Sequence, residues 1–300
     1  MNPRPRLSVV VIFFNMEREA ERTLYTLSCH YQKNITSCDY EVIAIDNASS
    51  KPLSEKFVKQ YGDNFRYHYY DTTSKSPSEA INFGVSITEA PTVACIVDGA
   101  RMLSPNIVHQ TLLACKAFNN PFVMSLAWHL GPKEQNQSML EGYNQNTEDQ
   151  LLADTDWREN GYRLFDVSTQ ASSSKVGFFG GLPEELSYFA INKSMFQELG
   201  GFCEEFQSPG GGLVNHDFLQ RIIENDSLNL VMLLGEGSFH QFHGGIATNS
   251  HPENHPWSTF ALEYKRIRKR DFELLDQPDG KKITYMGTKP ESINRFIDLK

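Results

Sequence analysis

Apolar runs and amphipathic stretches alternate regularly over residues 1–130 of this chain. The run Leu7–Phe13 is continuous, β-branched and aromatic, as in a strand that is buried on both faces of a sheet. The following residues, 17–31, place apolar side chains at helical spacing. Such alternation with short connections predicts an open, largely parallel sheet with helices on both faces. By the same criteria we expect strands at 41–46, 65–70, 92–97 and 121–127, and helices over 53–61, from 76 and from 104.

The second half of the chain is less regular. Residues 131–177 are rich in Gln, Asn, Ser and Asp, which predicts a functional loop or an insertion. Order returns afterwards, with strands expected at 186–191 and 228–234 and helices at 193–199, 215–224 and 258–275.

Composition excludes several classes of protein. Among 300 residues, 40% are apolar and 22% charged, which is typical of a folded globular chain. The net charge of −9 argues against a nucleic-acid-binding surface. The longest apolar runs fall far short of the roughly 20 residues of a membrane span. The five cysteines are odd in number and form no CxxC pair, so we expect a reducing compartment and neither a disulfide scaffold nor a zinc site.

Two predicted strands end in an aspartate, Asp46 and Asp98. In parallel α/β sheets, ligands bind at the carboxyl ends of the strands, so either carboxylate could contact a ligand. A turn-forming aspartate is the simpler alternative at both positions. After Asp98, Gly99 would let a ligand approach the backbone, and Asn82 in the preceding helix could point into the same crevice.

Five motifs occur in an order that resembles the family-2 glycosyltransferases with the GT-A fold. The resemblance covers residues 6–120 firmly and 178–248 more loosely. The motifs are Phe14-Asn15-Met16-Glu17, Gln32 at the end of a helix, Asp46-Asn47-Ala48-Ser49, Ala80-Ile81-Asn82-Phe83-Gly84, and Asp98.

The resemblance implies a nucleotide-sugar site in the first half of the chain. Asp46 would hold the base, Asp98 would contact ribose or a metal, and Lys75 could meet the diphosphate. The residues that we expect to bind the nucleotide sugar are Phe14, Asn15, Glu17, Asp46, Ser49, Lys75, Asn82, Asp98, Gly99 and Arg101.

The chain departs from the family pattern after Asp98. The second aspartate of the family's Asp-x-Asp motif, usually a metal ligand, is replaced by Ala100, and Arg101 follows it. Either the metal, Mn or Mg, is held differently, or Arg101 supplies positive charge to the leaving diphosphate.

Two histidines could compensate for the missing carboxylate. His240 and His243 stand three residues apart in a Gly-flanked stretch after a predicted strand, and imidazole is a good metal ligand. Related GT-A enzymes use a histidine in this region, so we expect a metal site of Asp98, His243 and His240. Structural histidines are the alternative.

The catalytic base also departs from the pattern. Gly200-Gly201-Phe202 resembles an acceptor-side segment of the family, and the position where the family carries its base is Asn215, which cannot take a proton. We expect Asp217 to serve instead, with His216 second. An ion pair between Asp217 and Arg221, one helical turn later, is the alternative.

The carboxyl-terminal tail contains a basic segment, KRIRKR, over residues 265–270. It fits either a solvated helix face or attraction to an anionic membrane surface. Residues 1–6 lead straight into a predicted strand without a signal-peptide core, so we expect a cytoplasmic protein. Peripheral contact with the inner face of a membrane is a further expectation.

Together these features predict a GT-A domain over 1–250 and a helical extension over 251–300. Within the domain, 1–130 would bind the nucleotide sugar, 131–177 would vary, and 178–250 would carry the acceptor and catalytic half. We expect acceptor specificity to reside in segment 131–177 and around Trp128. The resemblance implies non-processive, inverting transfer from a nucleotide-diphosphate sugar, UDP-linked by preference, to a saccharide or lipid-linked hydroxyl acceptor in surface polysaccharide or glycolipid synthesis. A catalytically inactive nucleotide-sugar-binding protein is the alternative, and the oligomeric state is not predicted.

Overall fold

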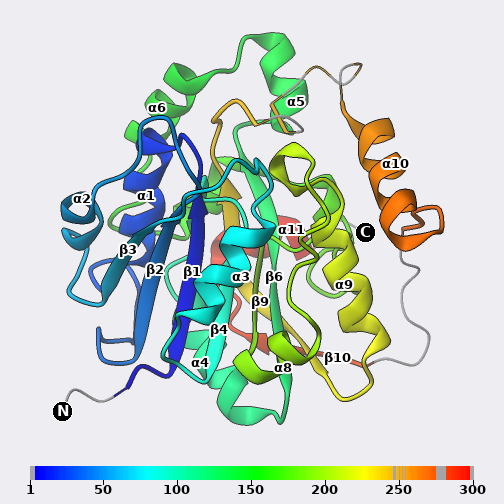
Figure 1. The fold of residues 1–300 in the computed structure, drawn as a ribbon. Helices are drawn as coiled ribbons and strands as arrows, with labels where there is room; N and C mark the ends of the chain where they lie inside the picture. Colours follow the sequence, from blue (N-terminus) through cyan, green and yellow to red (C-terminus); the bar gives the residue numbers. More distant parts are fainter. Residues whose placement is uncertain are drawn as a thin grey trace.

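The predicted strand over Leu7–Phe13 is β1, and it lies within a mixed sheet (Figure 1). A computed structural model of the chain describes residues 4–245, 248–249, 251, 253, 255–274 and 282–297. In this described part, the sheet has ten strands, ordered β10-β9-β6-β8-β4-β1-β2-β3, with β5 pairing with β9 and β7 with β6. Their bounds are β1 (Leu7–Phe13), β2 (Tyr40–Asp46), β3 (Phe65–Tyr69), β4 (Thr92–Ile96), β5 (Arg101–Leu103), β6 (Pro121–Leu130), β7 (Ser168–Gln170), β8 (Tyr188–Asn192), β9 (Asn229–His240) and β10 (Ile283–Gly287).

The strands at the predicted nucleotide half are parallel. β1 pairs in parallel with β2 and with β4, and β2 pairs in parallel with β3. β8 is antiparallel to both β4 and β6, whereas β6, β9 and β10 are parallel to one another. The mixed, mostly parallel sheet is therefore confirmed. Because Phe13 is in register with Asp46, the carboxyl ends of β1 and β2 lie at the same edge.

Helices cover both faces of the sheet (Figure 1). Alternation along β1 explains the two layers, since Val10 and Ile12 join one core with α3 and α9, while Val9 and Val11 join another core with α1 and α4. The helices are α1 (Glu17–Leu27), α2 (Glu55–Lys59), α3 (Ser78–Ser86), α4 (Ile107–Ala117), α5 (Gln135–Ser138), α6 (Gln145–Ala153), α7 (Arg163–Asp166), α8 (Lys193–Glu198), α9 (Val214–Glu224), α10 (Trp257–Arg268) and α11 (Asn294–Ile297), with 3-10 turns η1 (Met139–Glu141), η2 (Ser172–Ser174), η3 (Pro209–Gly211) and η5 (Glu291–Ile293).

The polar segment 131–177 is more ordered than its sequence indicates. It forms α5, α6, α7 and β7, which pairs with β6. Trp157 packs edge-on against Tyr31 at a centroid distance of 6.1 Å, and Arg18 on α1 pairs with Asp149 on α6. Because these helices are short and anchored by few apolar side chains, no apolar period is visible in the sequence.

The chain after residue 250 contributes a strand as well as helices. The helix expected over 258–275 ends at Arg268, because Lys269 adopts a left-handed φ of 58°; residue 275 lies outside the described residues. β10 then pairs in parallel with β9, and Phe296 of α11 packs on Trp128. None of the described helices is long and apolar enough to cross a membrane.

Candidate functional site

A cavity of about 500 Å³ opens at the carboxyl ends of β1, β2 and β4, where a parallel sheet is expected to bind its ligand. Segments from both halves of the chain form its wall, including the residues after β9 and the first turn of α9. Its lining consists of Ile12, Phe14, Asn15, Met16, Asn47, Lys75, Pro77, Val97, Asp98, Arg101, Glu185, Leu186, Pro209, Gly210, Gly212, Asn215, His243, Gly244, Gly245, Thr248 and Phe260.

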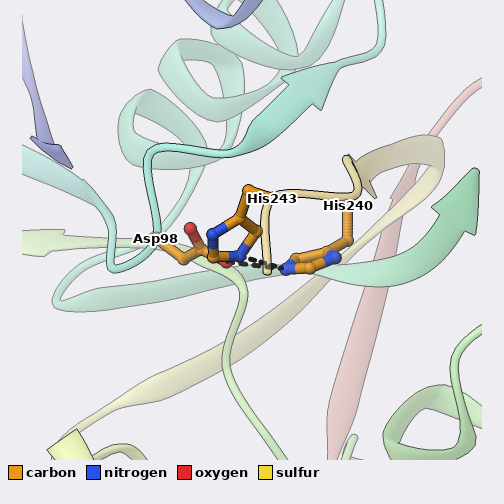
Figure 2. Close-up of side chains that lie close together, drawn as sticks. All are labelled: Asp98, His240 and His243. Atoms are coloured by element: carbon orange, nitrogen blue, oxygen red, sulfur yellow. Dashed lines mark hydrogen bonds and ion pairs between the residues drawn. The ribbon is translucent and has the colours of Figure 1, made fainter. Parts of the chain in front are cut away.

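Asp98, His240 and His243 converge beside this cavity (Figure 2). Asp98 follows β4, His240 ends β9, and His243 lies three residues further on. The His240 Nε2 atom is 2.9 Å from Asp98 Oδ2 and 3.2 Å from His243 Nε2. One ligand atom from each of the three residues lies within 4.8 Å of the other two. Two imidazole nitrogens and one carboxylate oxygen make a donor set that suits a divalent transition metal such as Mn²⁺.

Burial and charge set the protonation of this cluster. Burial lowers the pKa of His240 to about 4, although the nearby Asp98 opposes the shift, so the ring is neutral near pH 7. Burial alone would raise the pKa of Asp98, but the neighbouring His243 and His240 lower it by more. The net pKa of Asp98 therefore lies far below the ordinary range of an aspartate. A carboxylate anion beside a neutral His240 ring is a protonation state that suits metal binding.

Arg101 brings an unpaired positive charge to the cavity. It begins β5 and lines the cavity, yet its side chain is only 8% exposed. Neither its Nε nor its Nη1 atom has a hydrogen-bond partner among the described residues. A buried guanidinium with free donors is costly unless an anion accepts from it, so this position favours an anionic ligand.

The two strand-end aspartates have different surroundings. Asp46 is fully buried, and its two oxygens accept from the backbone N–H groups of Ser49 and Leu53. Ser49 in turn accepts from the N–H of Asn15. Asp46 and Ser49 therefore build the turn beneath the cavity and do not line it. Asn47, the next residue, does line it, and its Oδ1 atom has no partner among the described residues.

Of the other residues that we expected to bind the nucleotide, some line the cavity and others do not. Phe14, Asn15 and Lys75 line the cavity, while the exposed Glu17 does not. Asn82 uses its amide on the backbone of Phe202 and on Glu204, and so joins α3 to the Gly-Gly-Phe segment.

Gly99 has a packing role in this structure. A Cβ atom at this position would lie 2.4 Å from the Phe13 ring and 2.5 Å from the carbonyl oxygen of Ile12. Gly99 is absent from the cavity lining, so its small size serves the contact with β1.

The expected base, Asp217, is engaged by two arginines. Arg221 Nε donates to Asp217 Oδ2 at 3.1 Å, and Arg268 on α10 donates to both oxygens. Asp217 is 2% exposed and absent from the cavity lining. The i,i+4 ion pair that we weighed as the alternative is thus present. His216 also lies outside the lining, and its ring packs edge-on against Phe272.

Sequence reasoning missed Glu185 and Gln135. Glu185 lines the cavity on the wall of α9, where Asn215 Nδ2 lies 3.4 Å from its Oε1 atom. Gln135 is fully buried and contacts His240. Both contacts are long-range, so no local pattern marks either residue.

The class that the sheet and the cavity define is a nucleotide-diphospho-sugar transferase fold of the GT-A type. A family model described as glycosyltransferase like family 2 matches residues 8–235. The chain therefore belongs to the family 2-like glycosyltransferases, as the sequence motifs predicted.

Comparison with known structures supports the same fold, whereas a comparison with curated proteins gives no match. Residues 1–349 of S. aureus TarS in complex with UDP-GlcNAc are 14% identical, with a TM-score of 0.54 over 89% of this chain and 68% of that one. The same TarS segment in complex with UDP is 11% identical, with a TM-score of 0.50 over 80% of this chain. This chain spans 61% of the length of the UDP-bound TarS structure.

Proposed function

We propose that this protein transfers a sugar from a nucleotide-diphosphate donor to a hydroxyl acceptor with inversion. The observation that carries the proposal is the cavity that places the Asp98–His240–His243 cluster next to the unpaired Arg101. The Arg101 guanidinium, together with a metal held by the cluster, would suit a diphosphate, and the family membership supports a sugar as the transferred group. A UDP-linked donor is favoured because the similar TarS structures hold UDP and UDP-GlcNAc.

Charge neutralisation at the diphosphate is the first task of the site. Asp98, His240 and His243 would hold a divalent metal, which when bound stabilises negative charge on the leaving diphosphate. Arg101, which lines the same cavity, would place its positive charge beside the diphosphate. The histidine pair thereby replaces the carboxylate that Ala100 lacks.

Recognition of the nucleoside is the second task. Asn47 would contribute a polar side chain to the nucleobase, and Phe14 would contribute an apolar face, since both line the cavity. Asp46 acts indirectly in this proposal, because its turn fixes the position of Asn47.

Removal of the acceptor proton is the third task, and the cavity favours Glu185 over Asp217 and His216. Among the described residues that line the cavity, Asp98 and Glu185 are the two carboxylates. Asp98 is committed to the histidines, whereas Glu185 faces Asn215 at the position where the family carries its base. Glu185 is therefore the carboxylate able to accept a proton from a hydroxyl in the cavity.

Kinetics of two glutamate variants would test this assignment. We expect Glu185→Gln to lower the release of nucleotide from the donor by about 10²–10⁴-fold, the usual contribution of a general base, with donor affinity unchanged. The neighbouring Glu184, which is exposed and absent from the lining, provides the control Glu184→Gln with wild-type rates. Wild-type turnover in Glu185→Gln would reject Glu185 as the base. Loss of turnover in a correctly folded Asp217→Asn variant would instead support Asp217 as the base.

A catalytically inactive nucleotide-sugar-binding protein is the second candidate. Ala100 and Asn215 stand at two positions of usual chemistry and favour it. Donor binding without turnover in the wild type, across several acceptors and metals, would support this candidate. For the active enzyme we keep the expected acceptors, a saccharide or lipid-linked precursor of surface polysaccharide or glycolipid.

A further inference from the structure

We infer that Gln135, at the start of α5 in segment 131–177, is a positioning residue that fixes the tautomer of His240 and aims its Nε2 atom at Asp98 and His243. The inference rests on the metal site in the proposed function. It also gives the segment 131–177 a role at the donor site, in addition to the acceptor specificity expected there.

The orientation of the Gln135 amide follows from its neighbours. Gln135 is 0% exposed, so protein groups must satisfy its side chain. Its Nε2 atom lies 2.9 Å from the carbonyl oxygen of His240 and 3.4 Å from Glu148 Oε2. Both neighbours accept hydrogen bonds, so this end is the NH2 group and the other end is the oxygen.

The tautomer of His240 follows from the other end of the amide. The Oε1 atom of Gln135 lies 2.7 Å from His240 Nδ1 and 3.0 Å from Asn249 Nδ2. An amide oxygen only accepts, so His240 Nδ1 must carry a proton and donate it. On a neutral ring the Nε2 atom is then bare, and it faces Asp98 Oδ2 at 2.9 Å and His243 Nε2 at 3.2 Å. A cation between these atoms satisfies their lone pairs, and a fixed Nδ1–H is the usual support of a metal-binding histidine.

The same network shapes the turn that carries His243. Asn249 Oδ1 accepts from the N–H groups of His243, Gly244 and Gly245 at 3.1, 2.9 and 3.1 Å. Asn249 Nδ2 donates to Gln135, so one buried amide connects the turn to His240. Glu148 on α6 accepts from the N–H of Phe242 at 2.7 Å and completes the support. Gln135 therefore holds His240 directly, and it holds the turn that carries His243 through Asn249.

Binding of Mn²⁺ to two matched variants tests the inference. Gln135→Met keeps the side-chain length and removes the acceptor for His240 Nδ1; we expect Mn²⁺ affinity to fall about 10–100-fold, the usual loss for a removed outer-shell partner. Gln137→Met changes an exposed glutamine on the same helix and should bind Mn²⁺ like the wild type. Free Mn²⁺ measured by electron paramagnetic resonance gives the affinities. Equal affinity in both variants would overturn the inference.

The tautomer can also be measured in the unaltered protein, which avoids any folding defect of Gln135→Met. In 15N-histidine NMR spectra of the metal-free protein and of the protein with Zn²⁺, we expect a proton on His240 Nδ1 in both states. A bare Nδ1 in the metal-free wild type would overturn the role of Gln135. If the wild type binds no metal, the proposed metal site fails, and the tautomer still decides the role of Gln135.

Discussion

Asp217, the carboxylate expected to be the base, makes ion pairs that connect separate elements of the fold. It joins α9 to α10 through Arg268 and closes an i,i+4 pair with Arg221. Arg221 also donates to the carbonyl oxygens of Leu199 and Gly201. Asp217 therefore connects α9 directly to α10 and, through Arg221, to the segment that contains Leu199 and Gly201.

Replacement of Asp217 should affect stability more than turnover. We expect Asp217→Asn to lower the free energy of unfolding by about 2 kcal/mol, because charged hydrogen bonds are lost at a buried site, while the folded variant keeps its turnover. Asp271→Asn is the control, since Asp271 is exposed and its pair with Lys265 contributes little. Urea unfolding and nucleotide release measure the two effects. An unchanged unfolding midpoint in Asp217→Asn would contradict this structural role.

Gly99 gives a second prediction at the residue scale. Gly99→Ala would place a methyl group against the Phe13 ring and the Ile12 carbonyl oxygen, and the backbone oxygen cannot move cheaply. We expect a loss of about 1–3 kcal/mol of stability, as for other overpacked sites, measured by thermal or urea unfolding. Unaltered stability would show that the contact relaxes and would return Gly99 to the ligand role first expected.

Individual side chains were harder to predict than the motifs that contain them. The strand-end pattern indicated both Asp46 and Asp98, but the turn after Asp46 folds that carboxylate onto its own backbone and leaves Asn47 at the cavity. Glu185 and Gln135 contact partners 30 and 105 residues away in the sequence. No local sequence pattern reports such pairings.

At the scale of elements, β9 carries one buried carboxylic acid, Glu236, in addition to its terminal histidine. Glu236 is fully buried, and its carboxylate accepts from Ser104, from the N–H of Asn106 and from Tyr162. Burial raises its pKa to about 7 from 4.5, although the hydrogen bonds oppose the shift. The folded protein therefore holds this proton more tightly than the unfolded chain.

This difference predicts a pH dependence of stability. Because the folded pKa is raised, the stabilisation is present below pH 4.5 and is lost as pH rises to about 7. Glu236→Gln removes this contribution, so the variant should gain stability relative to the wild type across that window, by at most about 1.4 kcal/mol per pH unit. Urea unfolding at pH 5, 6, 7 and 8 measures the gain. Parallel stability curves for the two proteins would contradict it.

The predicted elements were most accurate where the period was strong. Strands β1, β2 and β4 match their predicted runs closely, because strands buried on both faces must be continuously apolar. β10 was missed, since ITYMG is short and only partly buried beside β9. The basic helix α10 was found, and Arg268 is used internally, so membrane contact of this helix stays a prediction.

At the scale of the whole molecule, the sheet and the family were predictable from sequence, while the site was predictable only in part. Because β1, β2 and β4 are parallel neighbours, the loops that follow them lie at the same edge of the sheet, and the motifs in those loops could be predicted to meet there. The opposite walls come from Glu185, from the glycine-rich loop before α9 and from the turn after β9, whose places depend on tertiary packing. The division at residue 250 stays a prediction, and β10 pairs with β9 across it.

The central claim is that one cavity binds a nucleotide-sugar through a metal cluster and Arg101. Thermal unfolding with UDP, UDP-GlcNAc and GDP-, CMP- and dTDP-linked sugars, each with Mn²⁺ or with EDTA, tests it most directly. We expect a selective rise in melting temperature with Mn²⁺, since ligand at 100 times its Kd stabilises by about 2.7 kcal/mol. The rise should disappear with EDTA and in Asp98→Asn. A rise that survives both would assign the diphosphate to Arg101 alone, and no rise with any nucleotide would contradict the account.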